Sequence, residues 1–218
     1  MIENKVNSPS RKQLELIYLY KLMVQDGYER IEGYHISKVF SDMEIHAFKK
    51  HIKILFDNFK VKTLLDYGCG GSDYEEAGFS LQKSAREYFE LTEIYLYEPA
   101  RDIDQRCKVD AVVCFDVLEH IYISDIPRVI RELFSLSEKI LVINVACYPA
   151  AALLPNGENA HITVRPPLWW KGVIDSIAVE YPNVSVQLWC STAWRKVEAY
   201  KLLKSSDWQE RDGFVVSL

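Results

Sequence analysis

The sequence predicts an α/β domain built on a mainly parallel β-sheet. From residue 61 onward, short apolar runs of strand length alternate with polar or helical stretches. Most of these runs lack polar alternation, which is typical of strands buried on both faces. The helical stretches supply the crossovers that parallel strands require. Because no linker rich in Gly, Ser or Pro is present, we predict one domain over residues 1–218, with a helical N-terminal cap (1–58) and a core (59–218).

Two helices are predicted ahead of the first strand. The first follows an N-cap at Ser10, keeps its apolar residues on one face, and ends at Gly27. The second is predicted to begin at Ser41, where Ser41 and Glu44 match the S-x-x-E capping box, and to continue to Phe56. These helices are expected to cover the core and not to form a domain of their own.

Six apolar runs are the predicted strands of the core. They are VKTLLDY (61–67), IYLYE (94–98), DAVVCFD (110–116), ILVINVA (140–146), VSVQLWC (184–190) and GFVVS (213–217). Two of the intervening helices are predicted to begin at Ser124 and at about Leu168. The connection between residues 98 and 110 barely reaches crossover length, so one helix, and with it a strand, is expected to be missing or reduced there.

Composition excludes several classes of protein. A net charge of −5 and a pI near 5.6 supply no attraction to phosphate backbones or anionic lipid, so we expect no nucleic-acid partner and no membrane partner. The N-terminal segment lacks the apolar core of a signal peptide, and no run reaches membrane-spanning length. The five cysteines are odd in number and form no CxxC pair, which favours reduced thiols and a cytoplasmic location.

A glycine-rich turn, DYGCGGS, directly follows the first predicted strand. Glycines at a strand end permit positive φ and let a ligand approach the backbone. Asp66 opens this turn, Glu98 closes the second predicted strand and Asp116 closes the third. Ligands of open parallel sheets bind beyond the carboxyl ends of the strands, so the three acids are expected to face one crevice. A tight structural turn is the alternative for the glycines. A solvated strand-end acid is the alternative for Glu98, and a turn-capping carboxylate is the alternative for Asp66.

These segments resemble the class I (Rossmann-like) S-adenosylmethionine-dependent methyltransferases, of the small kind found in bacteria and phages. The resemblance rests on DYGCGGS, YLYEPA and VVCFDVLEHI in this order and covers roughly Val61 to Ala146, with a fainter likeness in ENAHITVRPPLWW. It implies a doubly wound sheet with helices on both faces and S-adenosyl-L-methionine as cofactor. Ser72 departs from the family pattern, which often has a third glycine at this place.

The resemblance also implies roles for individual residues. The glycine turn would lie against the aminocarboxypropyl arm of the cofactor, Asp66 would face its amino group, and Glu98 would bind both ribose hydroxyls. Asp102 or Asp104 would accept from the amine of the adenine. The expected cofactor-binding residues are Asp66, Tyr67, Gly68, Cys69, Gly70, Glu98, Pro99, Asp116 and Val117.

Five further residues are predicted near a small-molecule acceptor. His120 and His161 are candidate catalytic bases, because the pKa of histidine lies nearest neutrality. Tyr34, Trp169 and Trp170 are candidate substrate residues. Packing is the alternative for His120, a structural hydrogen bond for His161, and burial of a helix against the sheet for the tryptophans. No set of residues has the ligand spacing of a zinc site, so we predict no metal.

An NAD(P)-dependent oxidoreductase is the main alternative, since it too has glycines after the first strand and an acid after the second. Its G-x-G-x-x-G fingerprint places a pyrophosphate at a helix N-terminus. Here Asp73 occupies the third glycine position, and Glu75 and Glu76 follow at the expected helix start, where they would repel a pyrophosphate. We therefore predict an S-adenosylmethionine-dependent methyltransferase acting on a small-molecule oxygen or nitrogen acceptor. A cofactor-binding regulatory protein without catalysis is the third possibility.

Overall fold

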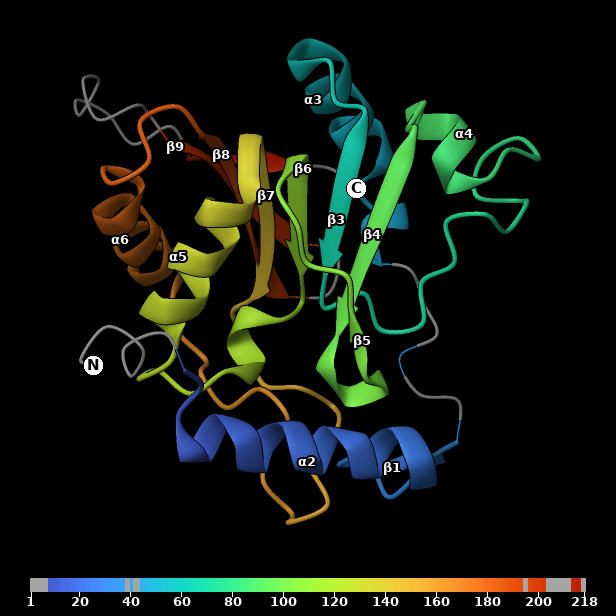
Figure 1. Cartoon of the computed structure of the whole chain (residues 1–218). Helices are drawn as coiled ribbons and strands as arrows, with labels where there is room; N and C mark the ends of the chain where they lie inside the picture. Colours follow the sequence, from blue (N-terminus) through green and yellow to red (C-terminus); the bar gives the residue numbers. More distant parts are fainter. Residues whose placement is uncertain (1–7, 38–39, 41–43, 194–195, 203–212, 217–218) are drawn as a thin grey trace.

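The computed structural model describes residues 8–37, 40, 44–193, 196–202 and 213–216. These residues form an eight-stranded sheet of order β10-β9-β8-β7-β6-β3-β4-β5 (Figure 1). Five neighbouring strands run parallel: β3 (Thr63–Tyr67), β4 (Glu93–Glu98), β6 (Val109–Phe115), β7 (Ser137–Ala146) and β8 (Ser185–Ala193). The antiparallel strands β5 (Ile103–Asp104), β9 (Lys196–Leu202) and β10 (Gly213–Val216) lie at the two edges. The predicted α/β class with a mainly parallel sheet is confirmed.

Helices cover both faces of the sheet. The helices α5 (Ile126–Leu136) and α6 (Pro167–Ala178) pack on one face, and α3 (Lys49–Phe59) and α4 (Ala85–Phe89) pack on the other. Successive residues of β6 point to opposite faces: Val112 is part of the core under α5 and α6, and Val113 is part of the core under α3 and α4. This two-sided burial explains why the strand runs show no polar alternation.

The helix α2 (Arg11–Asp26) crosses the carboxyl edge of the sheet. Figure 1 shows it beneath the sheet, across the end toward which the arrowhead of β3 points. It begins where predicted, because the Ser10 hydroxyl accepts a hydrogen bond from the backbone N–H of Gln13, and it ends at Gly27, which has a φ of 83°. Its residues Leu16 and Met23 pack against the segment that follows β7.

The second predicted helix begins later than the capping box indicates. Ser41 lies outside the described residues, and Glu44 opens a short 3-10 helix, η1 (Glu44–His46). The α-helix α3 starts only after Phe48, whose backbone is not helical (ψ 3°). The Phe48 ring is buried and stacks on Trp189 with ring centroids 4.8 Å apart. Packing against the sheet therefore takes precedence over the local capping pattern.

The connections from β3 to β4 and from β4 to β6 are irregular. Between β4 and β6 the chain forms only η2 (Pro99–Arg101) and the short strand β5, as the length of this connection predicts. After the glycine turn, the expected helix start at Asp73 is wrong. The Asp73 carboxylate accepts hydrogen bonds from the N–H groups of Glu75 and Glu76, which forms a turn, and the next helix begins at Ala85.

Strand β9 and the small hairpin of β1 (Tyr28–Glu29) and β2 (His35–Ile36) were not predicted from the sequence. Among the described residues, no helix combines the length and the apolar character that crossing a membrane would require.

Candidate active site at the carboxyl ends of the strands

A cavity of about 1170 Å³ lies at the carboxyl ends of β3, β4 and β6, between the sheet, α2 and α5. The chain leaves β3 toward β4 on one side and β6 toward β7 on the other, so this place is the switch point of the sheet, where open α/β folds bind ligands. All nine residues that the sequence analysis assigned to the cofactor line this cavity: Asp66, Tyr67, Gly68, Cys69, Gly70, Glu98, Pro99, Asp116 and Val117.

The glycine turn is held tightly between two strands. The N–H groups of Gly68 and Cys69 donate to the carbonyl oxygen of Tyr97 in β4, at 2.7 and 3.1 Å. Gly68 has a φ of 84°, and a Cβ built there would lie 2.2 Å from Cγ2 of Val117, at the end of β6. Only glycine fits this position without strain, both in its backbone conformation and in the space available.

Glu98 connects β4 to the glycine turn. Its Oε2 accepts from the N–H of Gly70 and its Oε1 from the N–H of Ala100, each at 3.0 Å. Burial raises the pKa of this carboxyl, and the two backbone hydrogen bonds act in the opposite direction. A carboxylate offers about four lone-pair sites, so each oxygen retains the capacity to accept from a ligand hydroxyl. Glu98 is therefore a braced and partly buried acceptor and not a solvated strand-end acid.

Asp66 lies buried beneath the turn and accepts a hydrogen bond from the Tyr74 hydroxyl at 3.0 Å. Burial raises the pKa of Asp66 to about 7, the hydrogen bond from Tyr74 opposes this shift, and the charge of Glu98 adds to it. A cationic group placed beside Asp66 would lower that pKa again. The pair of Asp66 and Glu98 gives this end of the cavity a preference for a ligand that carries a positive charge.

Asp116 closes β6 in a left-handed backbone conformation with a φ of 52°. Its carboxylate accepts from the Asn144 side chain at 2.6 Å, and Asn144 accepts in turn from the Ser191 hydroxyl at 3.1 Å. Burial raises the pKa of Asp116 to about 7. Neither Asn144 nor Ser191 was predicted as a supporting residue. The signal that could have identified Asn144 is a polar residue inside the apolar run 140–146.

The two candidate bases lie together, although they belong to different segments of the chain: His120 follows β6 and His161 follows β7. The rings of His120 and His161 stand edge to face with centroids 4.8 Å apart, and His120 lines the cavity. Burial lowers the pKa of His120 to about 3 and also lowers the pKa of His161. Because an effective general base has a pKa near the working pH, this environment weakens the predicted role of both rings as bases.

The structure does not bring the three predicted substrate residues to the cavity. Tyr34 is 66% exposed in the hairpin between β1 and β2. Trp170 is fully buried in the core under α6, and Trp169 packs against the same core. The tryptophans thus follow the alternative of a helix buried against the sheet, because α6 buries Trp170, Ile174 and Ile177 in the core that it shares with α5 and the strands.

The residues proposed for adenine also point elsewhere. Asp102 pairs with Lys21 of α2, and Asp104 pairs with Arg106, so both carboxylates are engaged with cations. Neither is among the residues that line the cavity.

Residues of α2 and Phe40 were missed as parts of the site. The carbonyl oxygen of Phe40 accepts from the N–H of Gly71 at 2.8 Å, so Phe40 lies directly on the glycine turn. Its ring packs beside Tyr20 and stacks on Tyr28, with centroids 5.9 and 6.1 Å away. The apolar face of α2 was visible in the sequence, but nothing there indicated that it covers the carboxyl edge of the sheet.

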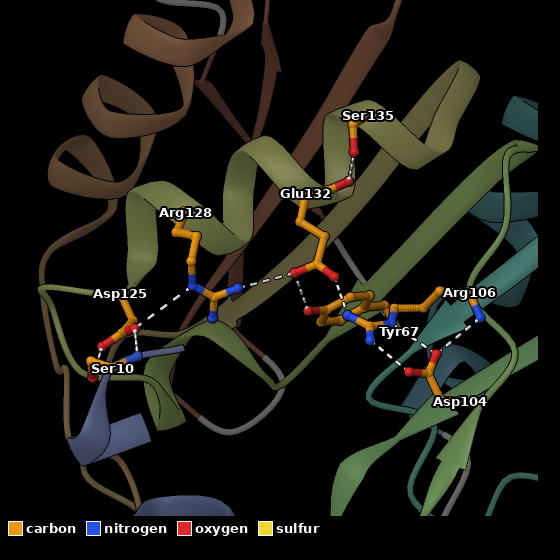
Figure 2. Close-up of polar contacts among 8 residues, drawn as sticks. All are labelled: Ser10, Tyr67, Asp104, Arg106, Asp125, Arg128, Glu132 and Ser135. Carbon is orange, nitrogen blue, oxygen red and sulfur yellow. Dashed lines mark hydrogen bonds and ion pairs between the residues drawn. The ribbon is translucent and has the colours of Figure 1, made fainter. Parts of the chain in front are cut away.

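The wall formed by α5 is polar and connects to α2 (Figure 2). The hydroxyl and the N–H of Ser10 donate to Asp125, at 2.6 and 3.0 Å, which anchors the start of α2. Arg128 bridges Asp125 and Glu132, and Glu132 accepts from the hydroxyl of Tyr67 at 3.2 Å. This network holds α2, α5 and the end of β3 around the cavity.

Comparison of the chain with protein-family models, with curated proteins and with solved structures gives no match. An assignment of function therefore depends on the residues and geometry of the cavity.

Proposed function

We propose that the protein is an S-adenosylmethionine-dependent methyltransferase that acts on a small-molecule oxygen or nitrogen acceptor. The observation that supports it most is the placement of the glycine turn, the buried Asp66 and the braced Glu98 around one cavity. The order β4-β3-β6-β7-β8 is compatible with a Rossmann-like fold. Ligand pockets usually measure about 300–1,000 Å³, so this cavity has room for a cofactor and an acceptor together.

The amino group and the ribose of the cofactor each have a matching group in this chain. The carboxylate of Asp66 suits the amino group of the cofactor, and the free lone pairs of Glu98 suit the two ribose hydroxyls. The sulfonium would lie near the rings of Tyr20 and Phe40, which line the cavity. Methyl transfer requires the acceptor in line with the sulfur–methyl bond, so positioning by these walls supplies most of the catalysis.

The structure weakens the case for a nicotinamide cofactor. Such enzymes hold the pyrophosphate at a helix N-terminus directly after the glycine turn. In this chain no helix follows the turn until Ala85, and the intervening stretch carries Asp73, Glu75 and Glu76. A phosphate group would meet carboxylates there without a helix dipole to stabilise it.

We expect the protein to bind S-adenosylhomocysteine with 1:1 stoichiometry and micromolar affinity, and NADH at least 100-fold more weakly. Isothermal titration calorimetry with the two ligands measures this difference. Tight binding of NADH without binding of S-adenosylhomocysteine would exclude the proposal. Turnover of labelled S-adenosylmethionine with a panel of hydroxyl and amine acceptors then separates an enzyme from a cofactor-binding regulator, because a regulator would bind the cofactor but methylate nothing.

Affinity for S-adenosylhomocysteine is expected to rise as the pH increases from about 6 to about 8 and then to level off. The pKa of Asp66 is about 7 in the free protein, so below pH 7 the ligand's ammonium must displace a proton from this carboxyl. Each pH unit below that value should cost up to about tenfold in affinity. Calorimetry at several pH values should show a smaller slope for Asp66→Asn than for wild type, and equal slopes would contradict the role of Asp66.

The raised pKa of Asp66 also makes the free energy of unfolding decrease as the pH rises. Its pKa in the folded protein lies above the ordinary aspartate value of 3.8, so the folded state binds more protons between these two values. The contribution of Asp66 to stability is fully present below pH 3.8 and is lost as the pH rises to about 7. Asp66→Asn should remove this part of the pH dependence when urea unfolding is measured without ligand.

A further inference from the structure

Three side chains able to ligate a metal ion meet beside the cavity. Glu119 and His120 belong to the 3-10 helix η3 (Leu118–His120), which follows β6, and His161 belongs to the segment between β7 and α6. One donor atom from each lies within 4.8 Å of the other two. The N–H of Thr163 donates to the carbonyl oxygen of Glu119 at 2.8 Å and holds the two segments together. Sequence spacing cannot reveal this group, because its third member comes from a distant segment.

The hydrogen bonds of both histidines leave the same nitrogen available. Nδ1 of His120 lies 2.9 Å from the carbonyl oxygen of Ala160, and Nδ1 of His161 lies 2.5 Å from that of Tyr148. A carbonyl oxygen only accepts, so each Nδ1 carries a proton. The Tyr20 hydroxyl oxygen also lies 2.5 Å from Nδ1 of His120, and it acts there as an acceptor because its own proton is donated to the Ala160 carbonyl at 3.1 Å. Each neutral ring therefore keeps a lone pair on Nε2. Histidines that bind metals commonly donate their other N–H to a backbone carbonyl in this way, which fixes the tautomer and the orientation of the ring.

The side chain of Glu119 is a second, independent observation that points to a bound cation. Its side chain is 0% exposed, and its Oε1 accepts from the N–H of Ala146 at 2.7 Å. Its Oε2 is also buried but has no hydrogen-bond partner among the described residues. A buried carboxylate oxygen without a partner is costly, and a cation at this place would satisfy it.

We propose that Glu119, His120 and His161 bind one divalent transition-metal cation of the Zn²⁺, Mn²⁺ or Fe²⁺ type. Two imidazoles with one carboxylate favour these ions over Mg²⁺ and Ca²⁺, which prefer oxygen ligands. Ligands about 2.1 Å from a metal are at most about 4.2 Å apart, so binding requires a small closing movement of these side chains. Three protein ligands leave coordination positions open.

The site adjoins the proposed acceptor region, because His120 lines the cavity. On the basis of the proposed function, this cation holds a hydroxyl acceptor and lowers the pKa of its proton, which favours oxygen over nitrogen as the methylated atom. In that transfer the oxygen–carbon bond forms as the sulfur–carbon bond breaks. The bonding electron pair stays on sulfur, which becomes a thioether, and the hydroxyl proton leaves to solvent.

Calorimetric titration of chelator-treated, tag-free protein with Zn²⁺, Mn²⁺ and Mg²⁺, without cofactor, tests the site. We expect one equivalent of Zn²⁺ or Mn²⁺ to bind at least tenfold more tightly than Mg²⁺. His161→Ala and Glu119→Gln should each weaken that binding at least tenfold, with circular dichroism confirming a folded chain. His35→Ala is the matched control, because His35 pairs with Glu29 in the hairpin away from the cluster, and it should bind like wild type.

A second measurement covers variants that fail to fold. Wild-type protein loaded with Co²⁺ should show the visible absorption of a cobalt site with nitrogen ligands. Absence of metal binding, binding that both variants leave unchanged, or a preference for Mg²⁺ would overturn the site. Binding of S-adenosylhomocysteine is measured separately, so failure of the metal site and failure of the proposed function are distinguishable.

Discussion

Glu98→Ala is expected to weaken the binding of S-adenosylhomocysteine at least 100-fold. Charge-assisted hydrogen bonds contribute about 1.5–3 kcal/mol each, and about 1.4 kcal/mol corresponds to a factor of ten in affinity, so loss of two bonds to the ribose reaches this magnitude. The variant also removes the acceptor for the N–H groups of Gly70 and Ala100, which loosens the glycine turn. Calorimetry of the wild type and the variant measures the change.

Glu93→Ala is the matched control for this prediction. Glu93 begins the same strand, is exposed, and binds the hydroxyl of Tyr95 away from the cavity, so its loss should leave the affinity within about twofold. Glu98→Gln keeps the shape of the side chain but replaces one acceptor oxygen by a donor, and an intermediate loss is expected. If Glu98→Ala binds S-adenosylhomocysteine like wild type, the assignment of the ribose to Glu98 is wrong.

Gly68→Ala is expected to lower the free energy of unfolding by about 3 kcal/mol or more, through strain in the backbone and overlap in packing. The new Cβ would lie 2.2 Å from Cγ2 of Val117. Val117 is β-branched, and its Cγ1 and Cβ both lie 3.4 Å from the same point, so rotation of the side chain gives little relief. Urea denaturation monitored by tryptophan fluorescence measures the loss.

Gly157→Ala separates the two causes of this loss. Gly157 has the same φ of 84°, but nothing lies within 4 Å of the position that a Cβ would take there, so this variant reports backbone strain alone and should cost about 1 kcal/mol. Adding Val117→Ala to Gly68→Ala should recover about 1–2 kcal/mol relative to the sum of the single variants. Additive losses in that cycle would show that the contact between Gly68 and Val117 is not the cause.

Much of the core was predictable because its physical causes are local. Strands buried on both faces must be continuously apolar, so β3, β6 and β7 are visible as runs such as VVCF. The ends of α2 are set by Ser10 and Gly27, which act on the backbone of their own helix. The meeting of Asp66, Glu98 and Asp116 at the cavity was predictable because a parallel sheet places the ends of successive strands at one edge. The other expected cofactor residues were implied by the resemblance to class I methyltransferases.

Local patterns failed where a distant contact competed with them. The start of α3 follows the stacking of Phe48 on Trp189, and the expected helix at Asp73 is replaced by a turn that lets Tyr74 reach Asp66. Trp169 and Trp170 carry no sign in the sequence of which surface they meet, and the packing of α6 places them in the core. An aromatic pair in an irregular stretch therefore does not by itself indicate a ligand site.

The sequence by itself determined the class of the fold, the strands of its parallel core, and the residues at the ends of those strands, since burial and backbone conformation are encoded by neighbouring residues. Only the tertiary structure decided which distant groups meet at that edge. It placed α2 along the cavity and Phe40 on the glycine turn, and it brought His161 beside Glu119 and His120. Such contacts depend on how segments distant in the sequence pack together, and the local periodicity of the sequence does not predict that packing.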